Sequence, residues 1–127
     1  MSDAHILVVD DNPANLKLAS DLLEWEGYQI SKAVDAQQAL DAIRQSIPDL
    51  ILMDIGLPGM DGLTLTRKLK ADDATKQIRI VAMTAFAMKG DERKTLDAGC
   101  DGYIAKPIDT RKLPDQVARC LRNETPL

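Results

Sequence analysis

Hydrophobic and polar residues follow one another along the chain in blocks that predict strands and helices in turn. Four short apolar runs, rich in β-branched residues, are typical of buried strands, and one weaker run alternates polar with apolar residues. The five expected strands are Ile6–Val9, Tyr28–Ala33, Leu50–Met53, Ile78–Met83 and Tyr103–Ala105. Apolar residues recur at helical spacing between these runs, which predicts a helix after each strand.

The expected helices have identifiable starts and stops. Asn12 followed by Pro13 is a typical helix start, and glycine is a typical stop. We expect helices from Asn12 to Gly27, from Asp35 through Ile47, from Asp61 through Leu69, up to Ala98 before Gly99, and from Leu113 through Leu121. Trp25, near the end of the first helix, is expected to be half-buried.

Alternating strands and helices predict an α/β fold. The central runs are continuously apolar, which indicates a parallel sheet covered by helices on both faces. The alternating run near residue 30 and the short run near residue 104 suit the two edges of this sheet. The sequence therefore predicts a doubly wound (βα)5 fold with a five-stranded parallel sheet. Ligands bind such sheets beyond the carboxyl ends of the strands.

Reactive side chains stand where four of the five strands are expected to end. Asp10 and Asp11 follow the first strand, and Asp54 follows the third. Thr84 ends the fourth strand and Lys106 follows the fifth, whereas the second strand ends without a reactive group. Because the carboxyl ends of parallel strands meet at one edge of the sheet, we expect these five side chains to share one crevice.

Three carboxylates in one crevice repel one another. Two unit charges about 4 Å apart cost about 4 kcal/mol at an effective dielectric constant of 20, and one lysine cannot neutralise three acids. Mg2+ can, because carboxylate oxygens suit this ion, which also accepts a substrate phosphate as a ligand. Asp10 and Asp11 are therefore expected to hold Mg2+, Asp11 the more directly. Asp54 is the candidate nucleophile that forms an aspartyl phosphate, with Thr84 and Lys106 binding the phosphoryl oxygens.

Each of these residues has a simpler interpretation by itself. Acids after a strand are often helix caps, and a lysine before a proline, as in Lys106–Pro107, is unremarkable. A phosphatase of the haloacid dehalogenase type would also use Mg2+ and a strand-end aspartate, but it needs an acid two residues later, where this chain has Gly56. The first loop of a flavodoxin holds a phosphate, which Asp10 and Asp11 would repel. The five groups together favour phosphoryl transfer.

Length, charge and residue composition narrow the possible classes of protein and partner further. The 127 residues suit a single domain, and a net charge of −4 with a pI of about 4.9 argues against a nucleic-acid partner. No run reaches the roughly 18 apolar residues of a membrane span, and no basic region precedes the first apolar run as in a signal peptide. We expect a cytoplasmic protein without membrane association. Cys100 and Cys120 are expected to be reduced thiols, and the single His5 disfavours zinc and Ser-His chemistry.

The motifs at the strand ends resemble those of one family. DD after the first strand, MDIGLPGMDG around the third, TA after the fourth and KP after the fifth are similar to the receiver domain of bacterial two-component response regulators. The resemblance covers residues 5–122 and implies a flavodoxin-like or CheY-like sheet of order 2-1-3-4-5. It also implies site roles: Asp54 as phosphoacceptor, Asp10, Asp11, Asp54 and the Gly56 carbonyl as metal ligands, Thr84 and Lys106 as phosphoryl-binding groups, and a cis peptide before Pro107.

Within the family, TAFAMKGDE (84–92) and AGCDGYIAKPI (98–108) are most similar to a single-domain cell-division regulator, and they also resemble receivers of hybrid histidine kinases. We expect residues 1–127 to form a freestanding receiver without an output domain, as a monomer or weak dimer. The expected partners are a sensor histidine kinase or histidine phosphotransfer protein and a phospho-dependent protein effector. No enzymatic activity is expected beyond its own phosphorylation and dephosphorylation. A phosphorelay intermediate that passes the phosphate onward is the alternative.

The resemblance also assigns residues that respond to the phosphate. Tyr103, a core aromatic on the simpler interpretation, becomes the switch residue that turns inward when Thr84 moves toward the phosphoryl group. Phosphorylation would shift a pre-existing equilibrium and change the surface of the fourth helix, fifth strand and fifth helix. Ala85 is small and leaves the site accessible. Phe86, together with Gly56, is expected to set the lifetime of the phosphate.

Overall fold

The structure is a computed structural model that describes residues 4–55, 62–84, 97–105 and 108–122. It contains the strands β1 (His5–Val9), β2 (Gln29–Ala33), β3 (Leu50–Asp54), β4 (Arg79–Thr84) and β5 (Gly102–Ala105). The helices within these residues are α1 (Pro13–Trp25), α2 (Ala36–Gln45), α3 (Gly62–Ala71) and α5 (Leu113–Leu121). The helix expected before Gly99 falls largely outside the described residues, although Gly99 itself has the left-handed φ of +103° that favours glycine.

The five strands form one parallel sheet in the order β2-β1-β3-β4-β5. The predicted fold class and strand order are thereby confirmed, and so are the two edge strands, β2 and β5. In the described part of the chain no helix is long and apolar enough to cross a membrane.

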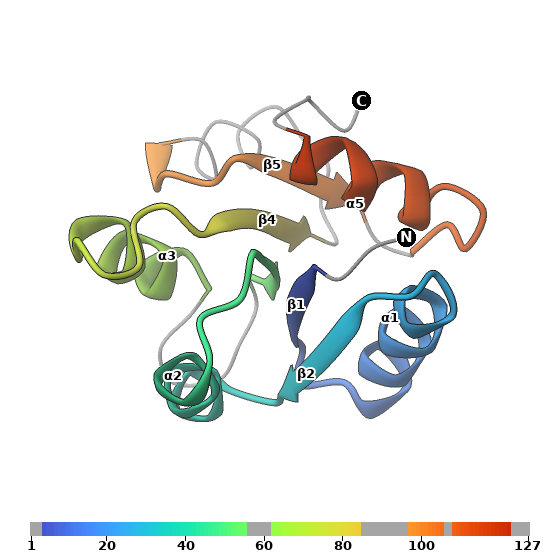
Figure 1. Cartoon of the computed structure of the whole chain (residues 1–127), viewed down its shortest axis with the longest axis horizontal. Coiled ribbons are helices and arrows are strands. Elements are labelled where there is room, and N and C mark those ends of the chain that lie inside the picture. Colours follow the sequence, from blue (N-terminus) through green and yellow to red (C-terminus); the bar gives the residue numbers. More distant parts are fainter. Residues whose placement is uncertain (1–3, 56–61, 85–96, 106–107, 123–127) are drawn as a thin grey trace.

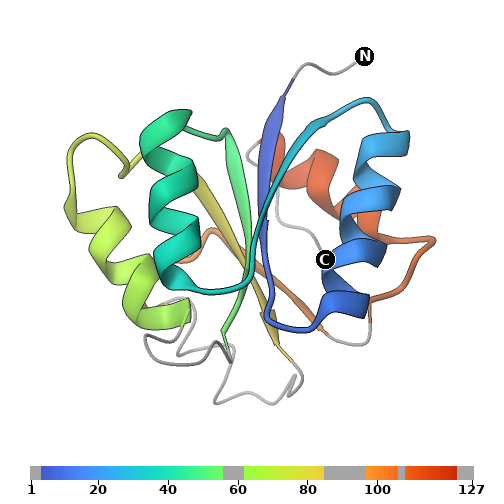
Figure 2. The same cartoon turned by 90° about the horizontal axis from the view of Figure 1, so that it is seen from below.

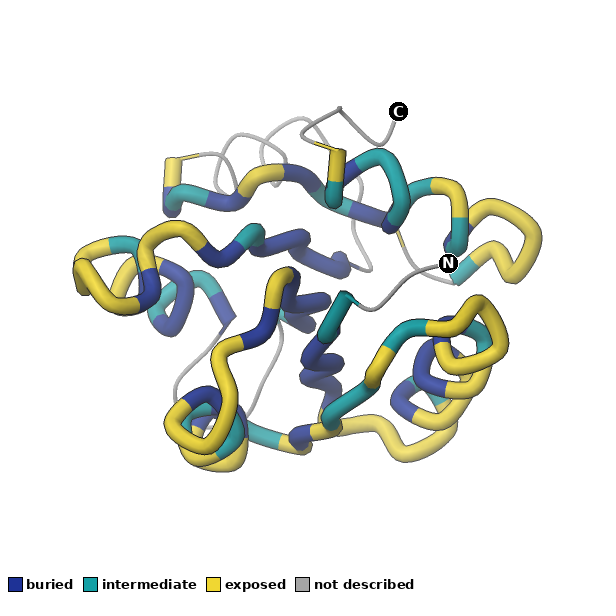
Figure 3. Tube along the Cα trace, viewed as in Figure 1, coloured by how far each residue is buried: buried dark blue, intermediate teal, exposed yellow. Residues whose placement is uncertain are grey.

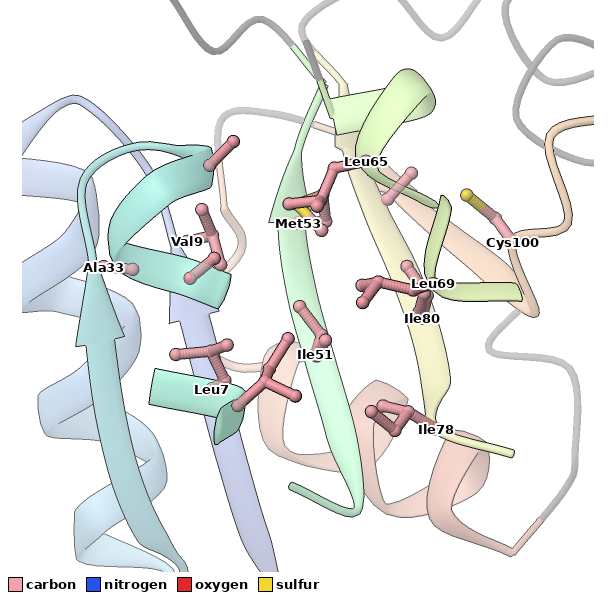
Figure 4. Close-up of a cluster of buried hydrophobic side chains, with 14 residues drawn as sticks. Leu7, Val9, Ala33, Ile51, Met53, Leu65, Leu69, Ile78, Ile80 and Cys100 are labelled. Carbon is pink, nitrogen blue, oxygen red and sulfur yellow. The ribbon is translucent and has the colours of Figure 1, made fainter. Parts of the chain in front are cut away.

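Helices cover both faces of the sheet, with α1 and α5 on one side and α2 and α3 on the other (Figures 1 and 2). The strands lie buried between them, and the exposed residues are concentrated on the outer helix surfaces and the loops (Figure 3). Because successive strand residues point to opposite faces, each strand contributes to two cores. The α2/α3 core includes Leu7, Val9, Ile51, Met53, Leu65, Leu69 and Ile80 (Figure 4). The α1/α5 core includes Ile6, Val8, Leu23, Leu52, Val81, Met83 and Val117.

Local sequence signals set the ends of the helices. The side chain of Asn12 caps α1 by accepting hydrogen bonds from the first turn, with Pro13 as the first helical residue. Asp35 caps α2 in the same way, accepting the N–H of Gln38 at 2.8 Å. Gly27, just beyond α1, has a φ of +97°, as expected for a glycine stop. These three boundaries agree with the sequence prediction.

Two side-chain predictions were wrong. Trp25 is 88% exposed rather than half-buried, because α1 turns its opposite face, with Leu16, Ala19 and Leu23, toward the sheet. Ile47 does not extend the apolar face of α2: the helix ends at Gln45 and Ile47 is 51% exposed.

Lys70 in α3 joins segments that are distant in the sequence. Its ammonium donates to the carbonyls of Ile78 at 2.8 Å and Lys76 at 3.2 Å. It also lies 3.0 Å from a carboxylate oxygen of Asp101, and that oxygen accepts the N–H of Ile80 at 2.8 Å. The lysine side chain is 21% exposed and that of Asp101 is 42% exposed, so water screens the ion pair in part. Together they fix the start of β4 and the entry to β5 against α3.

Both cysteines are buried free thiols, as predicted. Burial raises the pKa of Cys100 and that of Cys120 from 9.0 to about 11. Neither thiol is therefore poised to react near neutral pH.

Candidate functional site

The carboxyl ends of β1, β3 and β4 meet at one edge of the sheet, the lower edge in Figure 2. Val9, the last residue of β1, pairs with Met53 of β3, so Asp10 and Asp54 stand at the same level. Asp54 in turn pairs with Met83, one residue before Thr84. Register alone therefore brings these side chains to adjoining strand ends.

Asp10, Asp11 and Asp54 form an acidic cluster. Each offers one carboxylate oxygen, and these atoms all lie within 4.8 Å of one another. Asp10 is fully buried and Asp54 is 7% exposed, whereas Asp11 is exposed. The three residues predicted to hold a metal are therefore close enough to share one ion.

Main-chain contacts hold Asp10 in this cluster. Its own N–H donates to the carbonyl of Ala33, at the end of β2, over 3.0 Å. Its side-chain Oδ1 accepts the N–H of Asn12 at 2.9 Å. Asn12 is the N-cap of α1. The carboxylate of Asp10 is therefore bonded directly to the residue that starts this helix.

A close backbone approach positions the chain around Asp54. Gly62, the first residue of α3, donates its N–H to the carbonyl of Ile55 at 3.3 Å. A Cβ atom at Gly62 would lie 2.4 Å from the carbonyl oxygen of Asp54 and 2.8 Å from the Cα of Ile55. Both contacts are with backbone, so a side chain here would displace either α3 or the end of β3. Glycine is required by this approach, not by a positive φ.

Thr84 and Tyr103 lie on the same face of the sheet. Tyr103 pairs with Ala82 of β4, two residues before Thr84, and residues two apart share a face. Thr84 is buried, and Tyr103 is partly buried against the α2/α3 core. Strand geometry therefore places the predicted switch pair on adjacent strands and on one side of the sheet.

Five of the predicted site residues lie outside the described residues: Gly56, Ala85, Phe86, Lys106 and Pro107. Their assigned roles stay predictions. Sequence reasoning treated Asn12 and Gly62 only as helix-boundary residues and missed their contacts with the acidic cluster. The signal was available in part, since Asn12 follows the DD motif and Gly62 is the last residue of the MDIGLPGMDG motif.

The chemistry of the cluster fits a hard cation. Three carboxylates supply only oxygen donors, as Mg2+ prefers, and their mutual repulsion is relieved by a bound positive charge. Two of the three are buried at the sheet edge, where repulsion is less screened than at the surface. The residues present can therefore hold a divalent metal ion.

Fold, acidic cluster and sequence together define the class of protein. The chain belongs to the response regulator receiver domain family, whose family model matches residues 6–118. It is 45% identical over 112 residues to the polar-differentiation response regulator DivK of Brucella anthropi, an alignment that covers 88% of this chain and 91% of that protein. The predicted resemblance to receiver domains, and among them to a cell-division regulator, is confirmed.

Solved structures of receivers share this fold. A response regulator from Chloroflexus aurantiacus is 29% identical with a TM-score of 0.90, covering 95% of this chain and 99% of that one. The signal receiver domain of a signal transduction histidine kinase from Syntrophus aciditrophicus is 31% identical with a TM-score of 0.85, covering 94% and 90% of the two chains. The same architecture therefore occurs both in response regulators and within a histidine kinase.

Proposed function

We propose that this protein is a response regulator that accepts a phosphoryl group from a phosphohistidine donor onto Asp54, with Mg2+ bound by the acidic cluster. The observation that carries this proposal is the acidic cluster itself, three carboxylates within 4.8 Å at the ends of β1 and β3 in a receiver-family chain. Three carboxylates this close repel one another, and a bound cation relieves that repulsion.

The reaction transfers one phosphoryl group from the donor histidine to Asp54. A carboxylate oxygen of Asp54 attacks the phosphorus, the P–O bond forms, the P–N bond to the donor imidazole breaks, and the imidazole nitrogen takes a proton. Mg2+, when bound, neutralises charge on the phosphoryl oxygens and on the carboxylates. Attack of water on the phosphorus later releases inorganic phosphate and restores the carboxylate.

The chain itself contributes positioning. The β3 strand and the close approach of Gly62 fix the backbone that carries Asp54. The N–H of Asn12 orients the carboxylate of Asp10. Thr84, at the adjoining strand end, is assigned to a phosphoryl oxygen through its hydroxyl, and Lys106 to a second one. Catalysis of this kind depends mainly on positioning and electrostatics.

The output is a change at protein partners. The phosphoryl group draws Thr84 toward the site, and Tyr103, on the same face of the neighbouring strand, fills the space that the threonine leaves. This movement shifts the equilibrium between two conformations of the protein surface, and a phospho-dependent effector binds one of them. By the likeness to DivK, the regulated process is polar differentiation and cell division, in the cytoplasm.

A donor with a P–N bond tests the transfer. Phosphoramidate and MgCl2 should convert the protein to a phosphorylated form that is retarded on a phosphate-binding gel, and EDTA should prevent this. Asp54→Asn should abolish the product. Asp73→Asn removes an aspartate that is 95% exposed and is not part of the acidic cluster, so it should leave the product unchanged. Product formation in EDTA, or in Asp54→Asn, would contradict the assignment.

The two tyrosines of the chain allow the switch to be tested separately. With ring-labelled tyrosine, NMR should show the Tyr103 resonance shifting on phosphorylation while that of Tyr28, in the α1/α5 core, stays in place. Equal shifts, or none at Tyr103, would refute the proposed switch without touching the transfer chemistry.

A further inference from the structure

Asn12 is tied at once to the metal cluster and to the first helix. Its main-chain N–H donates to Asp10 Oδ1 at 2.9 Å. Its side-chain Oδ1 accepts the N–H groups of Ala14 at 2.9 Å and Asn15 at 3.1 Å. Its carbonyl accepts the N–H of Leu16 at 3.0 Å. One exposed residue therefore fixes a buried carboxylate and the first turn of α1.

The two sets of bonds depend on each other. The N–H of Asn12 has no freedom of its own, because φ fixes its direction relative to the rest of the residue, and φ is −90° in the extended backbone here. The side-chain cap holds that backbone conformation, since the amide oxygen reaches the first-turn N–H groups only from it. Removing the side-chain oxygen therefore loosens the donor that orients Asp10.

Orientation of a ligand matters for metal affinity. Groups that hydrogen-bond a ligating carboxylate fix its plane before the ion arrives, and losing such a group weakens binding about 10- to 100-fold. At Asn12 the main-chain donor survives the loss of the side chain, so a smaller effect is expected.

We infer that Asn12 is a positioning residue for the metal site: its side chain caps α1 and thereby aims its own N–H at Asp10, which sets the affinity for a divalent cation. The inference rests on the proposed function, because it assumes that the acidic cluster binds a metal. It assigns the side chain of Asn12 no contact with the ion.

Substitutions of Asn12 by uncharged residues test the role of the capping oxygen without changing the charge of the site. Asn12→Ala removes the capping oxygen, and so does Asn12→Gly, which disturbs the helix less because glycine is itself accepted at helix N-caps. Asn12→Ser keeps a capping oxygen. Thr75→Val is the structural control: it removes a buried 2.6 Å hydrogen bond to the carbonyl of Leu69, ahead of β4 at the opposite edge of the sheet.

The measurement is Mn2+ and Mg2+ titration calorimetry at pH 7, alongside urea unfolding in EDTA. We expect Asn12→Ala and Asn12→Gly to raise the Kd about three- to tenfold, Asn12→Ser to stay within about twofold of wild type, and Thr75→Val to lose stability at unchanged Kd. Wild-type affinity in both Asn12→Ala and Asn12→Gly, or equal losses in Asn12→Ser, would overturn this inference alone. No binding by the wild-type protein would overturn the proposed metal site with it.

Discussion

Removing the exposed acid of the cluster should make the metal-free protein more stable. Asp11 places a carboxylate oxygen within 4.8 Å of those of Asp10 and Asp54, so Asp11→Asn relieves two repulsions at once. At 4.8 Å each repulsion costs about 3.5 kcal/mol at a dielectric constant of 20 and about 0.9 kcal/mol at that of water. Because Asp11 is exposed, the total for both pairs falls nearer the lower value, about 2 to 3 kcal/mol.

An opposing effect reduces this gain. Asp11 precedes α1, whose N-terminus favours a negative charge by about 0.3 to 1 kcal/mol. Repulsion is the larger of the two effects. Asp11→Asn should therefore raise the free energy of unfolding in EDTA at low salt by about 1 to 2 kcal/mol, and high salt should shrink the gain by screening.

The assay is urea unfolding at pH 7 followed by circular dichroism, since the 88% exposed Trp25 reports folding poorly. Glu24→Gln, at an exposed acid in α1, changes net charge equally and should stay within about 0.5 kcal/mol of wild type. At a Mg2+ concentration 100 times the Kd the wild-type protein gains about 2.7 kcal/mol, which should abolish or reverse the difference. An Asp11→Asn protein no more stable than wild type in EDTA would refute the argument from repulsion.

Three further predictions concern the scaffold. Lys70→Met leaves a carboxylate and two carbonyls without their ammonium donor and should lower the free energy of unfolding by about 2 to 3 kcal/mol. The exposed Lys68→Met is its control, and equal unfolding midpoints in urea for the two variants would contradict this role. Ser20 is fully buried in α1, and its hydroxyl has no hydrogen-bond partner among the described residues. Ser20→Ala should therefore raise the free energy of unfolding by about 1 kcal/mol, and a loss of stability in the same urea titration would show that the hydroxyl is bonded. Burial raises the pKa of Cys100 to about 11, so above pH 9 the unfolded state releases a proton that the folded state keeps. Stability is therefore fully present below pH 9 and should fall between pH 9 and 11, more steeply in wild type than in Cys100→Ala; parallel curves would contradict the shift.

The sheet, and the edge of it that carries the reactive side chains, were predictable because both follow from the pattern of apolar and polar residues. Continuous apolar runs indicate strands buried on both faces, and parallel strands end at a common edge. The sequence pattern therefore predicts that Asp10, Asp54 and Thr84 lie together, and β-strand register puts their strand ends side by side.

The wrong predictions arose at helix ends. Trp25 lies two residues beyond the buried Leu23, a rotation of roughly 200° around the helix, so its spacing already indicated the outer face. Ile47 precedes Pro48, and a residue before proline disfavours the helical conformation, which explains why α2 ends at Gln45.

Contacts made by the backbone could be read only in part from residue types. The N–H of Asn12 on Asp10 is a local bond between residues two apart, whereas the approach of Gly62 to the carbonyl of Asp54 depends on how α3 packs beside the end of β3. An aspartate often accepts the N–H two residues ahead, so the Asp10–Asn12 bond has a local sequence signal. The close approach of Gly62 to Asp54 has none, because it depends on tertiary packing.

Intact mass after treatment with acetyl phosphate tests the central claim most directly, because this donor needs no partner protein. With MgCl2 the wild-type protein should gain the mass of one phosphoryl group, and it should gain none in EDTA. Asp54→Asn should gain none under either condition, while Asp11→Asn should gain markedly less than wild type. An adduct that persists in Asp54→Asn, or no adduct from acetyl phosphate or any phosphohistidine donor, would contradict phosphorylation of Asp54.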